Sequence, residues 1–150
     1  MKILIDADGC PVINSTIRVA KRYNIDVILV CDTSHIFNID NIEVIVVSKG
    51  ADSVDFILVN KICVGDIVIT QDYGLAAMCL AKKAIPLNQN GFVYNDENID
   101  GMLFSRHISK TSRNRGRHHG SHIKKRTKTD DIKFETCLDK IIKLKISEGF

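Results

Sequence analysis

The sequence predicts one α/β domain in which a mostly parallel sheet lies between two layers of helices. Three observations favour this class. The chain has 150 residues, which is the usual size of a single domain. Its apolar, β-branched runs are continuous, as is typical of strands buried on both faces of a parallel sheet. These runs alternate with helical patterns, which is the order of elements in a three-layer α/β/α sandwich.

The first half of the chain predicts three strands and two helices. Proline is tolerated in the first turn of a helix, so Pro11 is expected to open a helix that ends at about Arg22. A second helix is expected from about Asp52, because apolar residues recur on one side of it. The three predicted strands are the apolar runs at 3–5, 27–30 and 44–47.

The second half continues the alternation and ends in a long helical pattern. Apolar residues at helical spacing from 130 to 144, behind an aspartate that would cap the helix, predict a C-terminal helix from about residue 130. A basic segment at 106–128 precedes it. The other predicted elements are a strand at 67–70, a helix at 73–84, short strands at 85–87 and 92–94, and a helix from about Ile99 to His107.

Composition excludes several classes of protein. Hydrophobic residues make up 45% of the chain, yet no apolar run approaches the roughly 20 residues that a membrane helix needs. Asp6 and Asp8 interrupt the first apolar run, and the basic region and cleavage site of a secretory signal are missing. The five cysteines show no C-x-x-C spacing, which favours reduced thiols over disulfides or a zinc ribbon. We therefore expect a cytoplasmic protein with no membrane partner.

Charge is unevenly distributed along the chain. Residues 106–128 contain nine lysines and arginines and no acid, whereas the remainder has twelve basic and eighteen acidic residues. Clustered cations bind nucleic acid by displacing counterions from phosphates. We expect a loop anchored at both ends, or a partly folded segment, that binds nucleic acid, with RNA favoured over DNA, although a solvated loop is the simpler alternative. The candidate binding residues are Arg113, Arg115, Arg117, His118, His119, His122, Lys124, Lys125 and Arg126.

Aspartates follow two of the predicted strands and begin one helix. Asp6 and Asp8 come at the end of the first strand, and Asp72 follows the strand at 67–70. Asp52 and Asp55 are three residues apart and share a helix face. Because such carboxylates would repel one another at one edge of the sheet, they predict a site for Mg²⁺ or Mn²⁺, which prefer oxygen ligands.

Helix capping is the plainer role for each of these aspartates, and Asp8 in particular is a candidate cap. Asp66 is expected to be purely structural because it precedes its strand. Six residues of extended chain separate Asp66 from Asp72 by roughly 20 Å. One site therefore cannot contain both.

The opening motif "DADGCPV" is similar to that of haloacid-dehalogenase-type phosphatases. The resemblance implies that Asp6 is a nucleophile and Asp8 a general acid. Thr33 and Ser34 would supply the serine or threonine that these enzymes place after the second strand. Two features disagree with the resemblance: Cys10 replaces the usual threonine, and the Gly-Asp pair at 65–66 precedes its strand, whereas the family's later acids follow theirs. This phosphatase is kept as an alternative.

Four motifs in order, "DADGCPV", "GADSVDFIL", "GDIVITQDYGLA" and "RGRHHGSHIKKRTKTD", closely resemble the YaiI/YqxD family of small bacterial proteins. The resemblance covers nearly the whole chain and implies a relationship to PIN and NYN nuclease domains. It therefore implies a PIN-like three-layer sandwich with a cluster of acids that binds Mg²⁺ or Mn²⁺. By position, those acids would be Asp6 or Asp8, Asp52 or Asp55, and Asp72.

The leading hypothesis is a metal-dependent nuclease-like protein that acts on RNA phosphodiesters. Asp6, Asp8, Asp52 and Asp72 would be the catalytic acids and metal ligands, and Asp55 would be a further ligand or would orient one. An RNA-binding module without catalysis is the second hypothesis. Three histidines in the basic segment, His118, His119 and His122, are also weighed as zinc ligands, although phosphate contact or solvent exposure is favoured.

Overall fold

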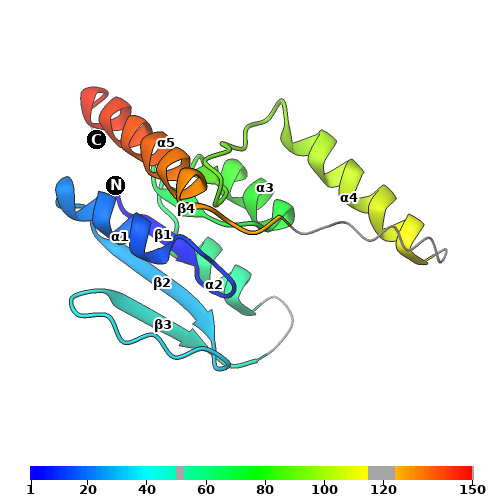
Figure 1. The fold of residues 1–150 in the computed structure, drawn as a ribbon, viewed down its shortest axis with the longest axis horizontal. Helices are drawn as coiled ribbons and strands as arrows, with labels where there is room; N and C mark the ends of the chain where they lie inside the picture. Colours follow the sequence, from blue (N-terminus) through cyan, green and yellow to red (C-terminus); the bar gives the residue numbers. More distant parts are fainter. Residues whose placement is uncertain (50–52, 115–123, 150) are drawn as a thin grey trace.

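The fold is built on one sheet of five parallel strands in the order β3-β2-β1-β4-β5 (Figure 1). The computed structural model describes residues 1–49, 53–114 and 124–149. Every strand pair in these ranges is parallel, so the predicted mostly parallel sheet is confirmed. The strands are β1 (Ile3–Asp6), β2 (Val27–Asp32), β3 (Glu43–Val47), β4 (Ile67–Ile69) and β5 (Ile85–Leu87).

Helices cover both faces of the sheet, which confirms the three-layer α/β/α sandwich. On one face lie α1 (Ile13–Arg22) and α5 (Lys128–Ser147), and on the other lie α2 (Ser53–Lys61) and α3 (Tyr73–Ala81). A further helix, α4 (Ile99–Asn114), packs on α3 and extends away from the sheet (Figure 1). No helix in the described ranges is long and apolar enough to cross a membrane.

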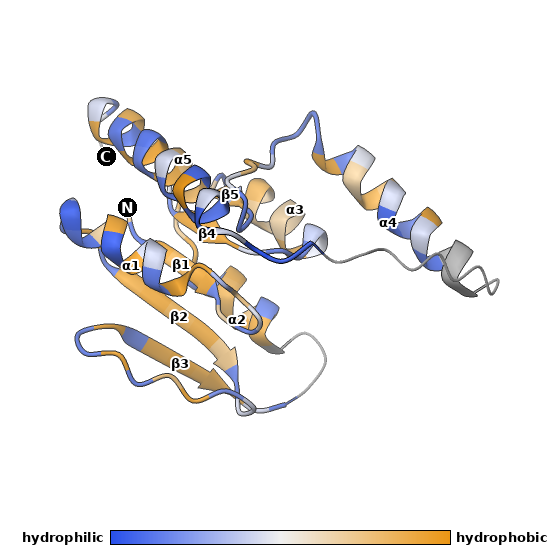
Figure 2. Ribbon diagram, in the orientation of Figure 1, coloured by the Kyte–Doolittle hydropathy of each residue, from blue (hydrophilic) through white to orange (hydrophobic). Residues whose placement is uncertain are grey.

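Alternation along β1 explains why the strands are apolar throughout. Ile3 and Ile5 belong to the core under α1 and α5, whereas Leu4 points into the core under α2 and α3. Phe134 of α5 and Leu58 of α2 close the two cores, and both are fully buried. Because each face of the sheet has its own helical layer, both sets of side chains must be apolar. Figure 2 shows the resulting band of hydrophobic residues along the central strands.

The strand order creates a crevice between β1 and β4. The chain runs from β1 outward through β2 to β3, and then returns so that β4 pairs with the other side of β1. Ile5 is opposite Ile69 in this pair, so Asp6 at the end of β1 and Thr70 after β4 emerge at the same edge. In open α/β sheets, ligands bind at such a switch point, outside the carboxyl ends of the strands.

The predicted strand at 92–94 is wrong. After β5, the Asn88 side chain accepts hydrogen bonds from the backbone N–H groups of Asn90 and Phe92 and turns the chain back. Only a single antiparallel bridge, between Leu87 and Val93, follows this turn.

The predicted end of the helix at His107 is also wrong, because α4 continues to Asn114. Lysine and arginine are good helix formers, and no glycine or proline follows His107 until Gly116. The apolar spacing also continues from Phe104 to Ile108. The basic segment at 106–128 therefore begins as a helix, which agrees with the partly folded alternative.

The C-terminal helix is confirmed, but its cap is a threonine and not an aspartate. The Thr127 side chain accepts a hydrogen bond from the Asp130 N–H, and the Asp130 carboxylate accepts one from the Thr127 N–H. This reciprocal pair is a capping box, which satisfies two N–H groups at the helix start. The helix consequently begins at Lys128, two residues before the predicted position.

Asp66 is structural, as predicted, and lies at the amino ends of β1 and β4. Its carboxylate accepts hydrogen bonds from Lys2 N at 3.0 Å and Cys63 N at 2.8 Å, and forms an ion pair with Lys2 Nζ at 2.8 Å. Its residue exposure is only 2%. The side chain therefore joins the start of β1 to the loop before β4.

We predict that Asp66→Ala destabilises the fold by about 2 to 3 kcal/mol, because two N–H groups lose a buried acceptor. The exposed Asp26, which lies just before β2 at the same end of the sheet, supplies the control Asp26→Ala. Urea unfolding followed by circular dichroism measures both variants. Equal midpoints for the two variants would show that Asp66 does not join these segments.

Candidate functional site

Asp6 is the centre of the candidate site. It is half-buried at the end of β1, where Thr70 Oγ1 donates a hydrogen bond to its Oδ2 at 3.0 Å. The pKa of the Asp6 carboxyl is raised to about 6, chiefly by burial and also by the charges of Asp55, Asp8 and Asp72, although the Thr70 hydrogen bond lowers it. The structure thus brings together four of the five aspartates that the sequence selected.

Asp72 combines a capping role with its place in the cluster. Its Oδ1 accepts a hydrogen bond from Leu75 N at 3.0 Å and caps α3. Its own N–H donates to Thr70 Oγ1 at 3.0 Å, so one hydroxyl links the Asp6 carboxylate to the Asp72 backbone. A Cβ at Gly74 would lie only 3.1 Å from Asp72 Oδ1, so a glycine there leaves room for the cap.

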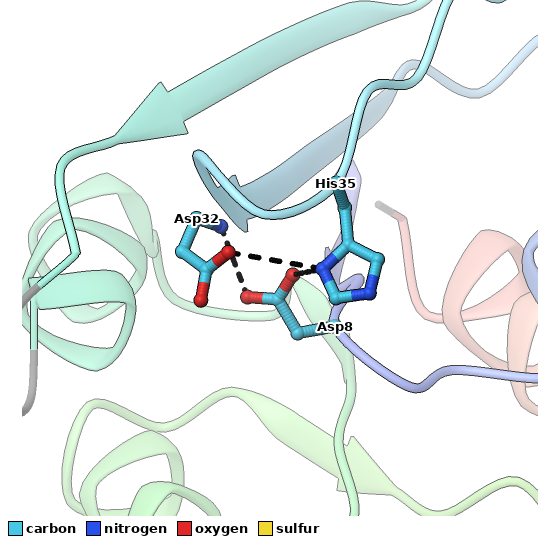
Figure 3. Close-up of side chains that lie close together, drawn as sticks. All are labelled: Asp8, Asp32 and His35. Atoms are coloured by element: carbon cyan, nitrogen blue, oxygen red, sulfur yellow. Dashed lines mark hydrogen bonds and ion pairs between the residues drawn. The ribbon is translucent and has the colours of Figure 1, made fainter.

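Asp8 belongs to a second group of side chains, with Asp32 and His35 (Figure 3). Asp8 Oδ2 accepts a hydrogen bond from Asp32 N at 3.0 Å, and Asp8 Oδ1 lies 2.7 Å from His35 Nδ1. The same nitrogen lies 3.7 Å from Asp32 Oδ1. The capping alternative for Asp8 is wrong, because α1 begins after Val12 without a side-chain cap.

These three side chains are close enough together for two carboxylate oxygens and one imidazole nitrogen to bind the same metal ion. One ligand atom from each residue lies within 4.8 Å of the others. Hydrogen bonds from Ser34 lower the pKa of Asp32, so this carboxylate stays charged near neutral pH. The contact between His35 and the two carboxylates is an ion pair only when His35 is protonated.

The other predicted helix-start acids are only partly described. Asp55 lies in the first turn of α2 and lines a hollow that it shares with Asp72. Asp52 lies outside the described residues. Asp55 is therefore the helix-start acid that the structure brings near Asp6.

A cleft of about 470 Å³ opens over the carboxyl ends of β1 and β4. Asp6, Asp8 and Asp72 line it, together with the side chains of Gln71 and Gln89. It adjoins the hollow that contains Asp55, with which it shares Asp72. The acids therefore lie in two adjoining hollows, which together are called the acidic depression.

The cleft also adjoins a hollow with a basic wall. The two share Gln71 and Gln89, and the second is lined by Lys124, Lys125 and Arg126. Both lysines are exposed. An acidic depression thus lies directly beside a basic rim.

Arg126 differs from the two lysines because its guanidinium already has three partners. It donates to Asp131 Oδ1 at 2.7 Å, to the Gln89 carbonyl at 2.7 Å and to Asn90 Oδ1 at 3.0 Å. These contacts connect the loop after β5 to the start of α5. Arg126 therefore supports the cleft wall structurally, whatever else it binds.

The remaining nucleic-acid candidates are only partly visible. Arg113 lies in the last turn of α4. The others lie outside the described residues, and they are Arg115, Arg117, His118, His119 and His122.

Four polar residues at this edge of the sheet were not selected from the sequence, namely Thr70, Arg106, Asp32 and His35. Asp32 ends an apolar strand and Thr70 follows one. Asp6 was selected because it lies at the end of an apolar strand, so the same argument could have selected these two residues. Arg106 was counted only as part of the basic segment, although it lines the cleft. Only the loop after β2, which returns toward β1, brings His35 to Asp8.

Cys10 lines the same cleft but is not activated. Burial raises the pKa of its thiol to about 11, so the group is neutral at physiological pH. All five cysteines are free, as the sequence predicted. Cys10 therefore acts as a small apolar residue at the cleft wall.

Comparison with known proteins identifies the family. A family model with the description "Uncharacterized BCR, YaiI/YqxD family" matches residues 4–144. The chain belongs to this YaiI/YqxD family. The match contains both the acidic depression and the basic rim, so the predicted resemblance is confirmed.

Relatives of similar length carry the name UPF0178 protein. The one from Ruminiclostridium cellulolyticum is 50% identical over 149 residues, which cover 99% of this chain and 96% of the relative. The one from Lachnoclostridium phytofermentans is 48% identical over 145 residues, which cover 95% and 97%. No solved structure matches the chain significantly.

We predict that Asp6→Asn stabilises the metal-free protein at high pH. The folded-state pKa of Asp6, about 6, lies above the ordinary aspartate value of 3.8, so ionisation of Asp6 favours unfolding as the pH rises through this window. The variant should gain up to about 3 kcal/mol over wild type at pH 8, and almost nothing at pH 4.

Urea unfolding in EDTA at both pH values measures this difference, with Asp26→Asn as the exposed control. If the gain at pH 8 were no larger than that of the control, Asp6 would not be destabilised by its surroundings.

Proposed function

We propose that this protein is a divalent-metal-dependent nuclease that hydrolyses RNA phosphodiesters. One observation carries the proposal: an acidic depression containing Asp6 and Asp72 adjoins a rim that carries Lys124 and Lys125. A nuclease needs this combination, because the metal ions require anionic ligands and the polyanionic substrate requires cations nearby.

The residues of the depression fit Mg²⁺ or Mn²⁺. Asp6, Asp72 and Asp55 offer only carboxylate oxygens, which these hard cations prefer. The raised pKa of Asp6 means that its charge is poorly compensated by the protein alone. When bound, the ion would supply Lewis acidity to the phosphodiester and activate water for in-line attack.

Residues of this chain would hold the ligands and the substrate in place. Thr70 fixes Asp6 through its hydroxyl, and the cap on α3 fixes Asp72. Lys124 and Lys125 would contact the RNA backbone from the rim. This arrangement supports a preorganised cluster of ligands whose side chains need not move when the substrate arrives.

We predict that Asp6→Asn and Asp72→Asn each reduce Mn²⁺-dependent cleavage of a single-stranded RNA by about 100-fold or more, because each removes an anionic ligand. A fluorescent oligonucleotide and denaturing gels measure the rate, and DNA of the same sequence tests the substrate class. Asp26→Asn, an exposed change at the opposite end of the sheet, is the control and should cleave at the wild-type rate.

Other outcomes would replace the proposal with its alternatives. RNA binding without cleavage by the wild type would identify an RNA-binding module. A phosphoaspartate trapped at Asp6 would identify a phosphatase. Equal cleavage by wild type and both variants would exclude this depression as the active site.

We also predict that Lys124→Ala with Lys125→Ala lowers the salt dependence of RNA binding. For each phosphate that the variant no longer neutralises, the slope of log K against log salt should fall by about 0.7 for single strands. Fluorescence anisotropy from low to moderate salt measures the slope. Lys21→Ala with Lys82→Ala, two exposed changes remote from the rim in sequence, is the charge-matched control, and an equal slope in both double variants would contradict the role of the rim.

A further inference from the structure

Arg106 lies at a position that is fixed by the packing of α4 on α3. Met102 and Leu103 pack into the small core that contains Tyr73. Residues three and four apart share a helix face, so Arg106 follows these two side chains along the same face. Because Tyr73 directly follows Asp72, this packing holds Arg106 beside the acidic depression.

The Arg106 guanidinium reaches the carboxylate cluster but is not buried there. Its Nη1 lies 3.5 Å from Asp72 Oδ1, and its side chain remains 54% exposed. It lines both the cleft that contains Asp6 and the adjoining hollow that contains Asp55. One cation therefore lines both hollows that contain the acids that would hold a divalent ion.

The ion pair between Arg106 and Asp72 is easily broken. Exposed pairs at this separation contribute little to stability, typically about 0 to 1 kcal/mol. Arg126 is different, because three close partners hold its guanidinium. Among the arginines that line these hollows, Arg106 is thus the one whose guanidinium can leave its carboxylate at little cost.

We propose that Arg106 has two alternating partners: Asp72 when no divalent ion is bound, and the scissile phosphate of the substrate when one is. The inference rests on the proposed nuclease function and adds a substrate-binding residue to it. A divalent ion beside Asp72 repels the guanidinium, because both are cations close to one carboxylate. The released guanidinium can donate two parallel hydrogen bonds to two phosphate oxygens, a geometry that the ammonium group of a lysine does not provide.

The alternative is a purely structural ion pair that holds α4 against α3. Under that alternative, the ion pair persists when metal binds, so removal of Arg106 changes stability and weakens RNA binding no more in a divalent ion than in EDTA. Under the proposal, Arg106 and the metal ion compete, so removal tightens metal binding and weakens RNA binding mainly when a divalent ion is bound. Metal affinity and RNA binding together separate the two without any measurement of cleavage.

The test compares Arg106→Gln, Arg106→Lys and Lys110→Gln with wild type. Lys110 lies one turn further along α4 and is exposed, so it controls for helix and net charge. Calorimetry with MnCl₂ should show that Arg106→Gln binds Mn²⁺ about threefold more tightly than wild type. Arg106→Lys keeps the competing charge and should bind like wild type, as should Lys110→Gln.

RNA binding supplies a second measurement on the same variants. In EDTA, Arg106→Gln should weaken binding of a single-stranded RNA only slightly, because Asp72 competes with the phosphate for Arg106. In Ca²⁺, with RNA integrity checked on a gel, Arg106→Gln should bind about tenfold more weakly. Arg106→Lys should fall between them.

The outcomes separate this inference from the function on which it rests. If wild type binds Mn²⁺ but Arg106→Gln binds it no more tightly, the inference is wrong and the metal site stands. If RNA binding weakens equally in EDTA and in Ca²⁺, Arg106 is an ordinary phosphate ligand and the alternation is wrong. If wild type binds no Mn²⁺, the proposed function fails, and the inference fails with it.

Discussion

The burial of the Asp6 carboxylate at the end of β1, among other aspartates, is the constraint on which the rest of the site depends. Asp6 is half-buried, and three other aspartates raise its pKa beyond the effect of burial. A fold selected for stability alone would not place an acid there. The Thr70 hydroxyl compensates only part of the cost with one hydrogen bond at 3.0 Å. What remains is an excess of negative charge that a cation can neutralise.

The fold concentrates this charge because of its topology. The return of the chain from β3 to β4 makes β1 and β4 neighbours, so their carboxyl ends emerge together. Asp66 lies at the opposite, amino ends of these two strands, where its carboxylate is paired with Lys2 and with the Cys63 N–H. Two aspartates of one short segment, Asp66 and Asp72, thus have opposite roles. Asp66 stabilises the fold, whereas Asp72 caps a helix and belongs to the acidic depression.

Cations near the depression also divide into roles that charge alone does not distinguish. Arg126 is held by Asp131 and by the loop after β5, so it shapes the cleft wall. Lys124 and Lys125 are exposed on the rim. Arg106 contacts Asp72 from a helix that extends away from the sheet (Figure 1). Partners and exposure therefore decide which cations are available to a phosphate, and which are parts of the protein framework.

The sequence by itself determined the three-layer class and its first-strand acid. Continuous apolar runs require helices on both faces, and Asp6 directly follows such a run. It also distinguished Asp66 from Asp72, since one precedes and the other follows the same strand. Only the tertiary structure decided that Asp8 pairs with His35, that Thr70 links Asp6 to Asp72, and that α4 brings Arg106 to the acids. Those contacts join segments far apart in the chain, and local spacing carries no information about which loops and helices return to the same edge of a sheet.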